Sequence, residues 1–302
     1  MSVSVPSFTK TYHTTSYPAL DPMQPALSTK GKTVIIACGD VDIAESAFDV
    51  ASSFAASGAS NIALICSVDQ ALLNAKSKLE RRYPSTNVEI YDADLTSTES
   101  VGVAAHNIRA SFGAWHVFVH NNRDASKNAT LAGSDTQDWW SIWEHNIRFT
   151  QHFAKHFMPK ARSDATYISE FSGAIYAPAS HVKGESACIA SQAAVLKLND
   201  HLAAEHPNLR VFNVHRDMCG HVRNSDGTLQ QWKHDSSVAS PELYGDFCVW
   251  LLSPEQDFLR GRSIWCNWDI EEMVAMKSEI AASPYSLTPS IGGMPFEQTI
   301  VL

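Results

Sequence analysis

The sequence contains no run of basic residues, and its charge balance is negative. Its 302 residues include 23 Lys and Arg against 32 Asp and Glu, which gives a formal net charge of -9. Nucleic acids and anionic membrane surfaces both attract clustered Lys and Arg, so this balance argues against either as a partner. No stretch reaches the roughly 20 apolar residues that a membrane-spanning helix needs. Residues 1–17 also lack the apolar segment of a signal peptide, so we expect a cytoplasmic protein.

Cysteines at metal-binding or redox spacing are also missing. There is no CxxC pair and no combination of Cys and His at ligand spacing. The six cysteines are widely scattered: Cys38, Cys66, Cys188, Cys219, Cys248 and Cys266. Most stand among apolar residues, where a free cysteine behaves as a small hydrophobic side chain. We therefore expect neither a disulfide framework nor a metal site.

From Lys32 onward, short apolar runs alternate with longer segments of helical pattern. Strands are predicted at 34–38, 61–66, 88–91, 115–120, 166–169, 210–214 and 263–267. Helices are predicted at 43–56, 68–82, 97–112, 136–156, 186–206 and 242–252. Apolar strands that alternate with helices are typical of a parallel sheet covered on both faces. The sequence thus predicts one doubly wound α/β domain over residues 31–282.

Polar, proline-containing segments flank this domain. Residues 1–30 carry four prolines and predict an extended arm that lies over the surface. Residues 283–302 carry three prolines and predict an irregular C-terminal tail.

Three long segments, together with the order of the elements, resemble the short-chain dehydrogenase/reductase family, and fungal members most closely. The segments are FTKTYHTTSYPALDP, HLAAEHPNLRVFNVH and GDFCVWLLSPEQDFLRGRSIWCNWD. None of them is catalytic, and the resemblance extends over about residues 30–280. It implies a Rossmann-type parallel sheet with helices on both faces. It also implies a homodimer or homotetramer formed through the two long helices at 136–156 and 186–206.

The cofactor motifs of this family are degenerate here. Between the first strand and helix the family has TGxxxGxG, whose glycines let the backbone approach a pyrophosphate. This sequence reads ACGDVDIA and keeps only Gly39, while Asp40 and Asp42 bring negative charge toward the phosphates, unless they cap the helix. The family's NNAG after the fourth strand is replaced by a segment in which Arg123 follows two asparagines. Arg123 would fill the cofactor groove, bind an anion there, or form a surface ion pair.

One cofactor position is retained. Asp94, in the segment DADLT, resembles the aspartate with which the family contacts adenine, and it fits a helix N-cap equally well. We expect no bound cofactor, with Gly39 and Asp94 as vestiges, and keep NADP as the alternative.

The catalytic group of the family is Asn, Ser, Tyr and Lys, and only the Asn is matched. Asn146 stands at its position, in SIWEHNIRF. The YxxxK spacing falls on SACIASQAAV, so Cys188 replaces the Tyr that acts as general acid or base, and Gln192 replaces the Lys that tunes it. The Ser position falls on Glu170, or on Ser172 if the loop is longer.

The pocket-forming Pro-Gly pair of the family is also lost. After the sixth strand, Arg216 and Asp217 take its place. Together these losses argue against ordinary ketone reduction.

The replacements point to a cleft with a different chemistry. The predicted catalytic residues are Glu170, Asn146, Cys188 and His120, and the predicted substrate-binding residues are Arg123, Arg216, Asp217, Gln192, Trp143 and His221. Glu170 with a neighbouring His or Arg could act as an acid/base pair without a redox cofactor. We therefore predict a redox-neutral cyclase, isomerase, dehydratase or pericyclase, whose substrate is a small hydrophobic natural product of secondary metabolism.

Each residue also has a structural interpretation. Glu170 could form a bridge with Arg216 or Arg123, His120 could be a hydrogen-bonded core histidine, and Trp143 could belong to the core. Two other function classes stay open: a non-catalytic binding or scaffold protein, and a divergent NADP-dependent oxidoreductase.

Overall fold

A single parallel sheet forms the centre of the molecule. The computed structural model describes residues 7–38, 43–121, 129–216, 221–223, 229–231 and 239–289. Seven strands lie in the order β3-β2-β1-β4-β5-β6-β9, and all their pairings are parallel. The strands are β1 (Thr33–Cys38), β2 (Asn61–Cys66), β3 (Asn87–Asp92), β4 (Trp115–Asn121), β5 (Ala161–Phe171), β6 (Arg210–His215) and β9 (Ser263–Trp265). The predicted doubly wound α/β fold is confirmed.

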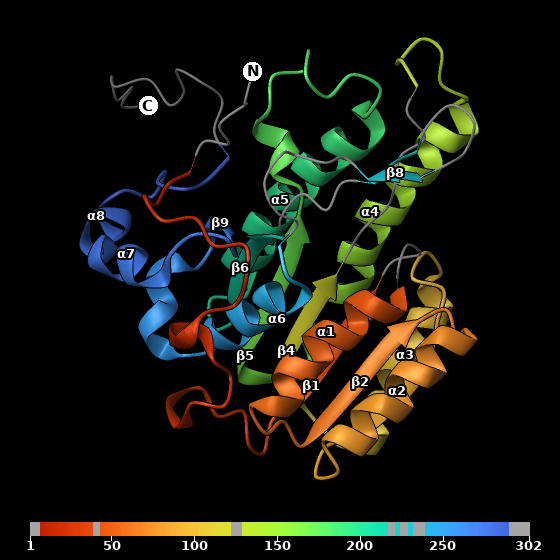
Figure 1. The fold of residues 1–302 in the computed structure, drawn as a ribbon. Coiled ribbons are helices and arrows are strands. Elements are labelled where there is room, and N and C mark those ends of the chain that lie inside the picture. Colours follow the sequence, from red (N-terminus) through yellow and green to blue (C-terminus); the bar gives the residue numbers. More distant parts are fainter. Residues whose placement is uncertain are drawn as a thin grey trace.

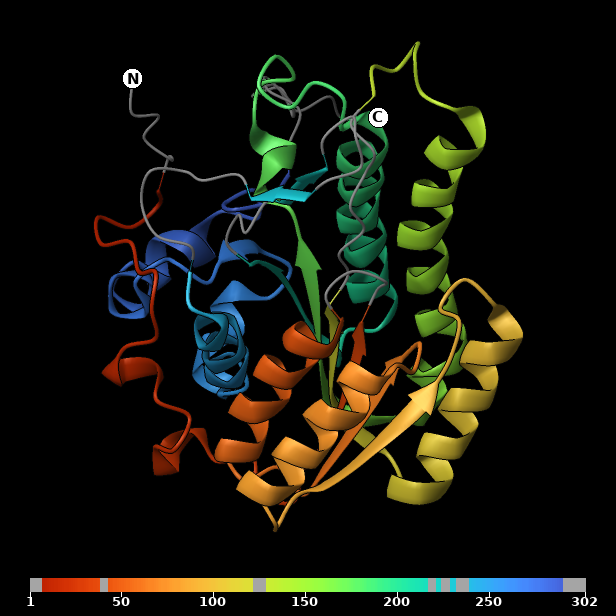
Figure 2. The same cartoon turned by 45° about the vertical axis from the view of Figure 1, so that its right-hand side comes forward.

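Helices cover both faces of this sheet (Figures 1 and 2). They are α1 (Ile43–Ala56), α2 (Gln70–Arg82), α3 (Thr98–Phe112), α4 (Thr136–His156), α5 (Ser186–Glu205) and α6 (Pro241–Trp250). Alternate residues of each strand face opposite layers, because side chains in a strand alternate in direction. Val34 and Ile36 join the core under α1, α2 and α6, whereas Ile35 and Ala37 join the core under α3 and α4.

The predicted elements differ from the observed ones mainly at their ends. The second helix begins at Gln70 rather than at 68, because the Asp69 carboxylate caps it by accepting a hydrogen bond from the Leu72 amide at 2.7 Å. The last strand ends at Trp265 rather than at 267, because the chain turns there and the Trp268 amide donates to the Trp265 carbonyl. β5 is longer than predicted and includes both Glu170 and the polar residues at its start.

Several short elements were not predicted. They are the hairpin β7 (His221–Arg223) and β8 (Leu229–Gln231), and the helices α7 (Ile270–Ala275) and α8 (Lys277–Ala282). Three-residue strands and six-residue helices carry too little periodicity to be recognised, and tertiary contacts decide them.

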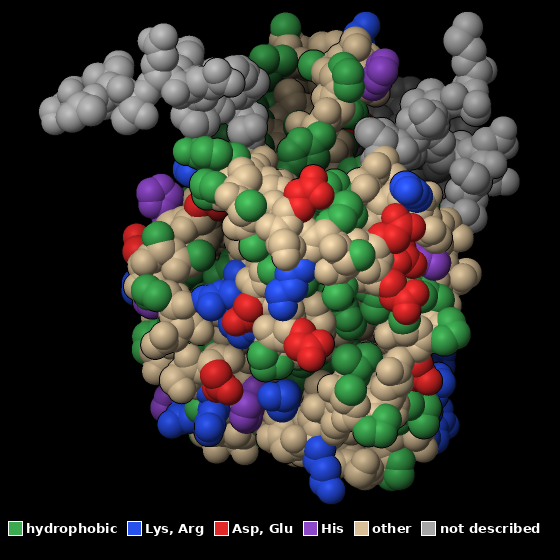
Figure 3. All heavy atoms as spheres, turned by 90° about the vertical axis from the view of Figure 1, so that its left-hand side faces the viewer, with side chains coloured by type: hydrophobic (Ala, Val, Ile, Leu, Met, Phe, Trp, Pro, Cys, Tyr) green, Lys and Arg blue, Asp and Glu red, His purple; other side chains and the backbone are tan. Residues whose placement is uncertain are grey.

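The N-terminal segment is anchored to the end of the domain. The Lys10 and Thr11 amides donate to the Glu272 carboxylate at 2.7 and 3.0 Å. His13 exchanges backbone and side-chain hydrogen bonds with Asn267, at 2.7 and 2.9 Å. This segment therefore lies beside α7 (Figure 1). On the face that α8 occupies, acidic and basic side chains are mixed (Figure 3).

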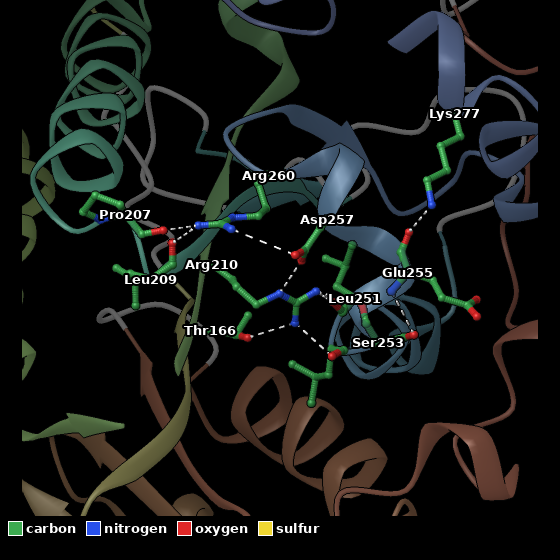
Figure 4. Close-up of polar contacts among 11 residues, drawn as sticks. Thr166, Pro207, Leu209, Arg210, Leu251, Ser253, Glu255, Asp257, Arg260 and Lys277 are labelled. Carbon is green, nitrogen blue, oxygen red and sulfur yellow. Dashed lines mark hydrogen bonds and ion pairs between the residues drawn. The ribbon is translucent and has the colours of Figure 1, made fainter. Parts of the chain in front are cut away.

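A single arginine holds the C-terminal end of α6 against the sheet (Figure 4). The Arg210 guanidinium donates to the carbonyls of Leu251, Leu252 and Ser253 at 2.7–3.0 Å, and its Nε donates to the Asp257 carboxylate at 2.7 Å. These carbonyls belong to the C-cap of α6 and the two residues after it, so the guanidinium fixes the turn that follows the helix.

The described residues include neither a membrane-spanning helix nor a metal-binding cluster. None of the helices there is long and apolar enough to cross a membrane. The same part of the chain holds no group of three or more His, Cys, Asp or Glu side chains arranged to bind a metal ion. The five cysteines that can be described are free thiols.

Candidate active site

Four charged and aromatic residues meet where β5 and β6 end, on the side of the sheet covered by α1 and α6. We call Glu170, Arg216, Asp49 and Tyr244 the arginine cluster. Glu170 is the last-but-one residue of β5, and Arg216 directly follows β6. The Arg216 guanidinium lies 3.6 Å from the Asp49 carboxylate of α1 and 5.4 Å from the ring centroid of Tyr244 in α6. The Arg216 side chain thus connects the carboxyl end of β6 to α1 and α6.

The electrostatics of this cluster favour the charged form of Arg216. Burial lowers the pKa of Arg216, but the combined influence of its neighbours, Glu170 first, outweighs burial and raises it. Glu170 itself is 6% exposed. A buried carboxylate keeps its charge only beside a compensating group. Burial raises the pKa of the Tyr244 phenol well above its usual value. The cluster therefore places a neutral phenol and two carboxyl groups around one guanidinium.

A second group lies between α4 and α5, on the opposite side of the sheet. We call Asn146, Cys188, Ser191 and Gln192 the amide–thiol cluster. The Asn146 Nδ2 donates to the Ser191 Oγ at 2.8 Å, and that hydroxyl donates to the Cys188 carbonyl at 3.0 Å. The Gln192 Nε2 lies 3.6 Å from the Cys188 Sγ. Asn146, Ser191 and Gln192 are buried, while Cys188 is partly exposed.

Gln192 connects this second cluster to the end of β5. Its Oε1 accepts a hydrogen bond from the Ser172 amide, two residues beyond Glu170. The Ser172 hydroxyl accepts from the Ala174 amide at 3.2 Å and caps the short helix Gly173–Tyr176. Of the two predicted candidates for the former Ser position, Ser172 therefore has a local structural role, whereas Glu170 remains within the strand.

His120 is not part of either cluster. It is 1% exposed on the side of β4 that faces α4, its Nδ1 lies 3.2 Å from the Tyr167 hydroxyl, and its ring packs 4.3 Å from Phe149. Burial lowers its pKa to about 3. A histidine that stays neutral inside an aromatic core is a poor candidate for acid/base work, so its structural interpretation accounts for the contacts better than its predicted catalytic role.

Asp94 is exposed just after β3. Its Oδ1 accepts hydrogen bonds from the Thr96 amide and hydroxyl at 2.8 and 2.7 Å, and these bonds, the hydroxyl first, lower its pKa. The N-cap of α3 is Ser97, so the predicted capping role of Asp94 is wrong by three residues. Asp94 shapes the turn that precedes the helix.

The remaining predicted residues divide into two groups. Gly39, Arg123 and Asp217 lie outside the described residues, as does the side chain of His221 in β7. Trp143 is described and lies in α4, where its ring stacks on that of Trp139 with centroids 5.4 Å apart.

Sequence reasoning missed several neighbours of the clusters. Asp49 and Ser191 were not predicted, although Ser191 stands one helical turn after Cys188. His215 was also missed: it is 2% exposed, and its Nδ1 lies 3.0 Å from the Gly173 amide. Its ring also packs 4.5 Å from that of Trp265. The position of His215 at the end of a predicted parallel strand could have indicated it as a site residue, because the carboxyl ends of parallel strands meet at one edge of the sheet.

The amide–thiol cluster does not fit a nicotinamide dinucleotide held in the family's usual way. The position of the ribose-binding Lys carries the Gln192 amide, which is already bonded to the Ser172 amide and lies beside the Cys188 thiol. An uncharged amide cannot lower the pKa of a neighbouring acid as an ammonium group does. The described residues therefore give no basis for deriving a hydride-transfer step.

Comparison with known proteins matches most of this chain to the short-chain dehydrogenase/reductase family. The profile of the family described as enoyl-(acyl carrier protein) reductase matches residues 45–267. A short chain dehydrogenase/reductase of Claviceps purpurea (strain 20.1) is 30% identical over 296 residues, which cover 94% of each chain. The short chain dehydrogenase pigC of Monascus ruber is 30% identical over 283 residues, which cover 90% of each chain.

Solved structures support the same fold. The structure of L-sorbose reductase from Gluconobacter frateurii, complexed with NADPH and L-sorbose, superposes with a TM-score of 0.67. It is 20% identical in sequence, and the match covers 80% of this chain and 96% of that one. At that identity, the likeness shows the fold and says nothing about the reaction.

Proposed function

The chain belongs to the short-chain dehydrogenase/reductase family, and we propose that it is a member that catalyses a redox-neutral reaction without a nicotinamide cofactor. The reaction class is a cyclisation, isomerisation, dehydration or pericyclic step. The substrate is a small hydrophobic natural product, a choice that rests on the similarity to fungal relatives. The catalytic residue is Glu170, and Arg216 positions it.

The observation that carries this proposal is the arginine cluster. Glu170 is buried at the carboxyl edge of the sheet, where ligands of doubly wound folds bind. Glu170 is the strongest of the charged groups that stabilise the partly buried Arg216 cation, which Asp49 holds from α1. A carboxylate held in a fixed position can accept a proton from a bound substrate, and the water-poor site opposes the loss of basicity that the neighbouring cation causes.

The chemistry needs no external oxidant or reductant. The Glu170 carboxylate takes a proton from a carbon next to a carbonyl, and the electron pair of the broken C–H bond moves toward the carbonyl oxygen. In an isomerisation, the carboxylic acid then returns the proton to another carbon. In a dehydration, the pair expels a β-hydroxyl group, which leaves as water with the proton held by Glu170. Both reactions leave the enzyme as it began.

The amide–thiol cluster has a supporting role in this proposal. Asn146, fixed by Ser191, orients the N-terminal part of α5, where the partly exposed Cys188 lies. The Gln192 amide lies beside the Cys188 thiol, and an uncharged amide does not activate a thiol as a base does, so Cys188 is assigned to substrate contact and not to nucleophilic attack. We also propose that the long helices α4 and α5 support a homo-oligomer.

The test is Glu170→Gln, an exchange of nearly equal size that removes the base. It should lower product formation by at least about a hundredfold in a deletion strain that re-expresses the variant. Glu80→Gln, at an exposed position of α2, is the matched control and should leave product formation unchanged. If a folded Glu170→Gln protein supports normal product formation, then Glu170 is not the base. Loss of product with the fold intact excludes a passive scaffold.

A second candidate function is an NADP-dependent oxidoreductase. Two observations favour it: membership of a family whose solved relatives include an NADPH complex, and the exposed Asp94 carboxylate after β3. Ligand analysis of the purified protein separates the two candidates. Stoichiometric NADP released on denaturation would support the oxidoreductase and contradict the cofactor-independent enzyme.

A further inference from the structure

Three tryptophans form a cluster in the N-terminal half of α4. Trp139 and Trp143 stack with ring centroids 5.4 Å apart and planes 27° apart. Trp140 packs edge-on against Trp139, with centroids 5.1 Å apart, and lies 6.1 Å from Trp143. We call these three residues the tryptophan cluster. This half of α4 lies beside α5 and rises above the carboxyl ends of the strands (Figures 1 and 2).

The three indoles differ in their polar contacts. The Trp139 Nε1 donates to the Ser186 Oγ at 3.1 Å. The Trp143 Nε1 is buried but finds no hydrogen-bond acceptor among the described residues. An indole N–H is a donor only, and a buried donor left unpaired costs free energy of folding. Packing alone does not require this N–H, because apolar contact depends on the ring surface and not on the donor.

The cluster adjoins the amide–thiol cluster at both helices. Ser186, which holds Trp139, is the first residue of α5 and stands two residues before Cys188. Trp143 stands one helical turn before Asn146 on α4, and α4 and α5 pack against each other. Trp140 is 53% exposed, so the cluster reaches from the helix interface to the surface.

We propose that the tryptophan cluster is a substrate subsite for a planar, conjugated ring system that carries a carbonyl group. The stacked indoles supply flat apolar faces of the kind on which aromatic rings pack. The Trp143 Nε1 donates its hydrogen bond to the carbonyl oxygen of the ligand. That bond satisfies the donor and fixes the orientation of the ring.

This inference rests on the proposed function in one respect, because it takes the cleft at this edge of the sheet to receive a small organic molecule. It does not depend on Glu170, and its test measures binding instead of turnover. Failure of the subsite therefore leaves the assignment of Glu170 standing. Failure of the Glu170→Gln experiment in turn leaves the subsite standing.

The test is equilibrium dialysis of the full chain with three probes. Fluorenone is planar and carries a carbonyl, fluorene is planar without one, and dicyclohexyl ketone has a carbonyl without a planar ring system. Fluorenone should bind most tightly of the three. Trp143→Phe keeps an aromatic ring and removes the N–H, so it should weaken fluorenone binding about tenfold and leave fluorene binding unchanged.

Trp268→Phe is the matched control, because it removes another buried indole N–H without an acceptor among the described residues, just after β9 and outside the tryptophan cluster, and it should change fluorenone binding less than about twofold. Circular dichroism and the midpoint of thermal unfolding establish that both variants are folded. Three results would each overturn the subsite. They are no saturable fluorenone binding, equal affinity for fluorenone and fluorene, and fluorenone affinity that Trp143→Phe leaves unchanged.

Discussion

The guanidinium of Arg216 lies 3.6 Å from the carboxylate of Asp49, although the two residues are 167 positions apart in the chain. The pair joins the end of β6 to the second turn of α1, and only 14% and 16% of the two side chains are exposed. Glu170 and the ring of Tyr244 complete the surroundings of the cation. Removing the cation would leave two carboxylates without compensation, and this dependence makes the cluster testable.

Replacing Arg216 with methionine should destabilise the protein by about 3 kcal/mol. The variant keeps an unbranched side chain but leaves the buried Glu170 carboxylate and the partly buried Asp49 carboxylate without their cation. Urea unfolding followed by circular dichroism gives the free energy. Arg148→Met is the control, because Arg148 pairs with Glu144 on an exposed helix face and its loss should cost less than about 1 kcal/mol. Equal losses in the two variants would show that the arginine cluster contributes no more than a surface ion pair.

His120 should make stability depend on pH in the mildly acidic range. Burial lowers its pKa in the folded protein to about 3, so between about pH 6.5 and 3 the unfolded chain binds a proton that the folded chain does not. The free energy of unfolding therefore falls as the pH falls through this window. The contribution of His120 to this loss is about 2 kcal/mol between pH 6.5 and 5. His120→Asn removes the titrating group, so its stability should fall less steeply over the same range. The quantity to compare is the slope of unfolding free energy against pH, and equal slopes would contradict a buried neutral His120.

Adding a methyl group at Gly173 should disturb the end of β5. An added Cβ would lie 2.7 Å from Trp265 Cζ2 and 3.1 Å from the His215 ring, and both rings belong to the packed interior. Gly173→Ala should therefore cost about 1–3 kcal/mol and lower the midpoint of thermal unfolding. Gly102→Ala is the comparison, since the Cβ there meets only the His156 ring, and alanine favours the helix by about 1 kcal/mol. A Gly173→Ala protein as stable as the parent would mean that this close approach relaxes without cost.

Arg210 should be the strongest anchor of the α6 terminus. Its side chain is 12% exposed and satisfies three carbonyls and one carboxylate (Figure 4). Arg210→Gln should cost about 3 kcal/mol, because charge-assisted bonds are lost and buried carbonyls lose their donor. Hydrogen exchange should accelerate at the last turn of α6. Lys197→Gln, at an exposed pair with Asp200, should leave stability within about 0.5 kcal/mol. Unchanged exchange at α6 would contradict the anchoring role.

The main elements could be predicted from the sequence because their local signals agree with the fold. β1 is a six-residue apolar run, and every one of its residues is buried. Asp69, Ser97 and Asp135 cap their helices with side-chain hydrogen bonds, as expected for these residue types. The short hairpin and the two short C-terminal helices could not be predicted, because three-residue strands and six-residue helices carry too little periodicity.

The candidate site could be predicted only where spacing along one helix defines it. Cys188 and Gln192 are four residues apart, so they lie on one helix face, and their side chains do approach each other. The partners of Asn146 and Arg216 lie on other elements, and no local pattern indicates Ser191 or Asp49. A buried histidine and a catalytic one also look alike in a sequence, which is why His120 was assigned to the cleft.

The most direct test of a cofactor-independent reaction is native mass spectrometry of the full chain, alone and with added NADPH. The former Tyr position holds the Cys188 thiol, and the former Lys position holds the Gln192 amide. This amide is already hydrogen-bonded to the Cys188 thiol and to the Ser172 backbone amide. We expect the mass of the protein alone, as purified and after NADPH is added. A stoichiometric NADP or NADPH adduct that survives desalting would contradict the account.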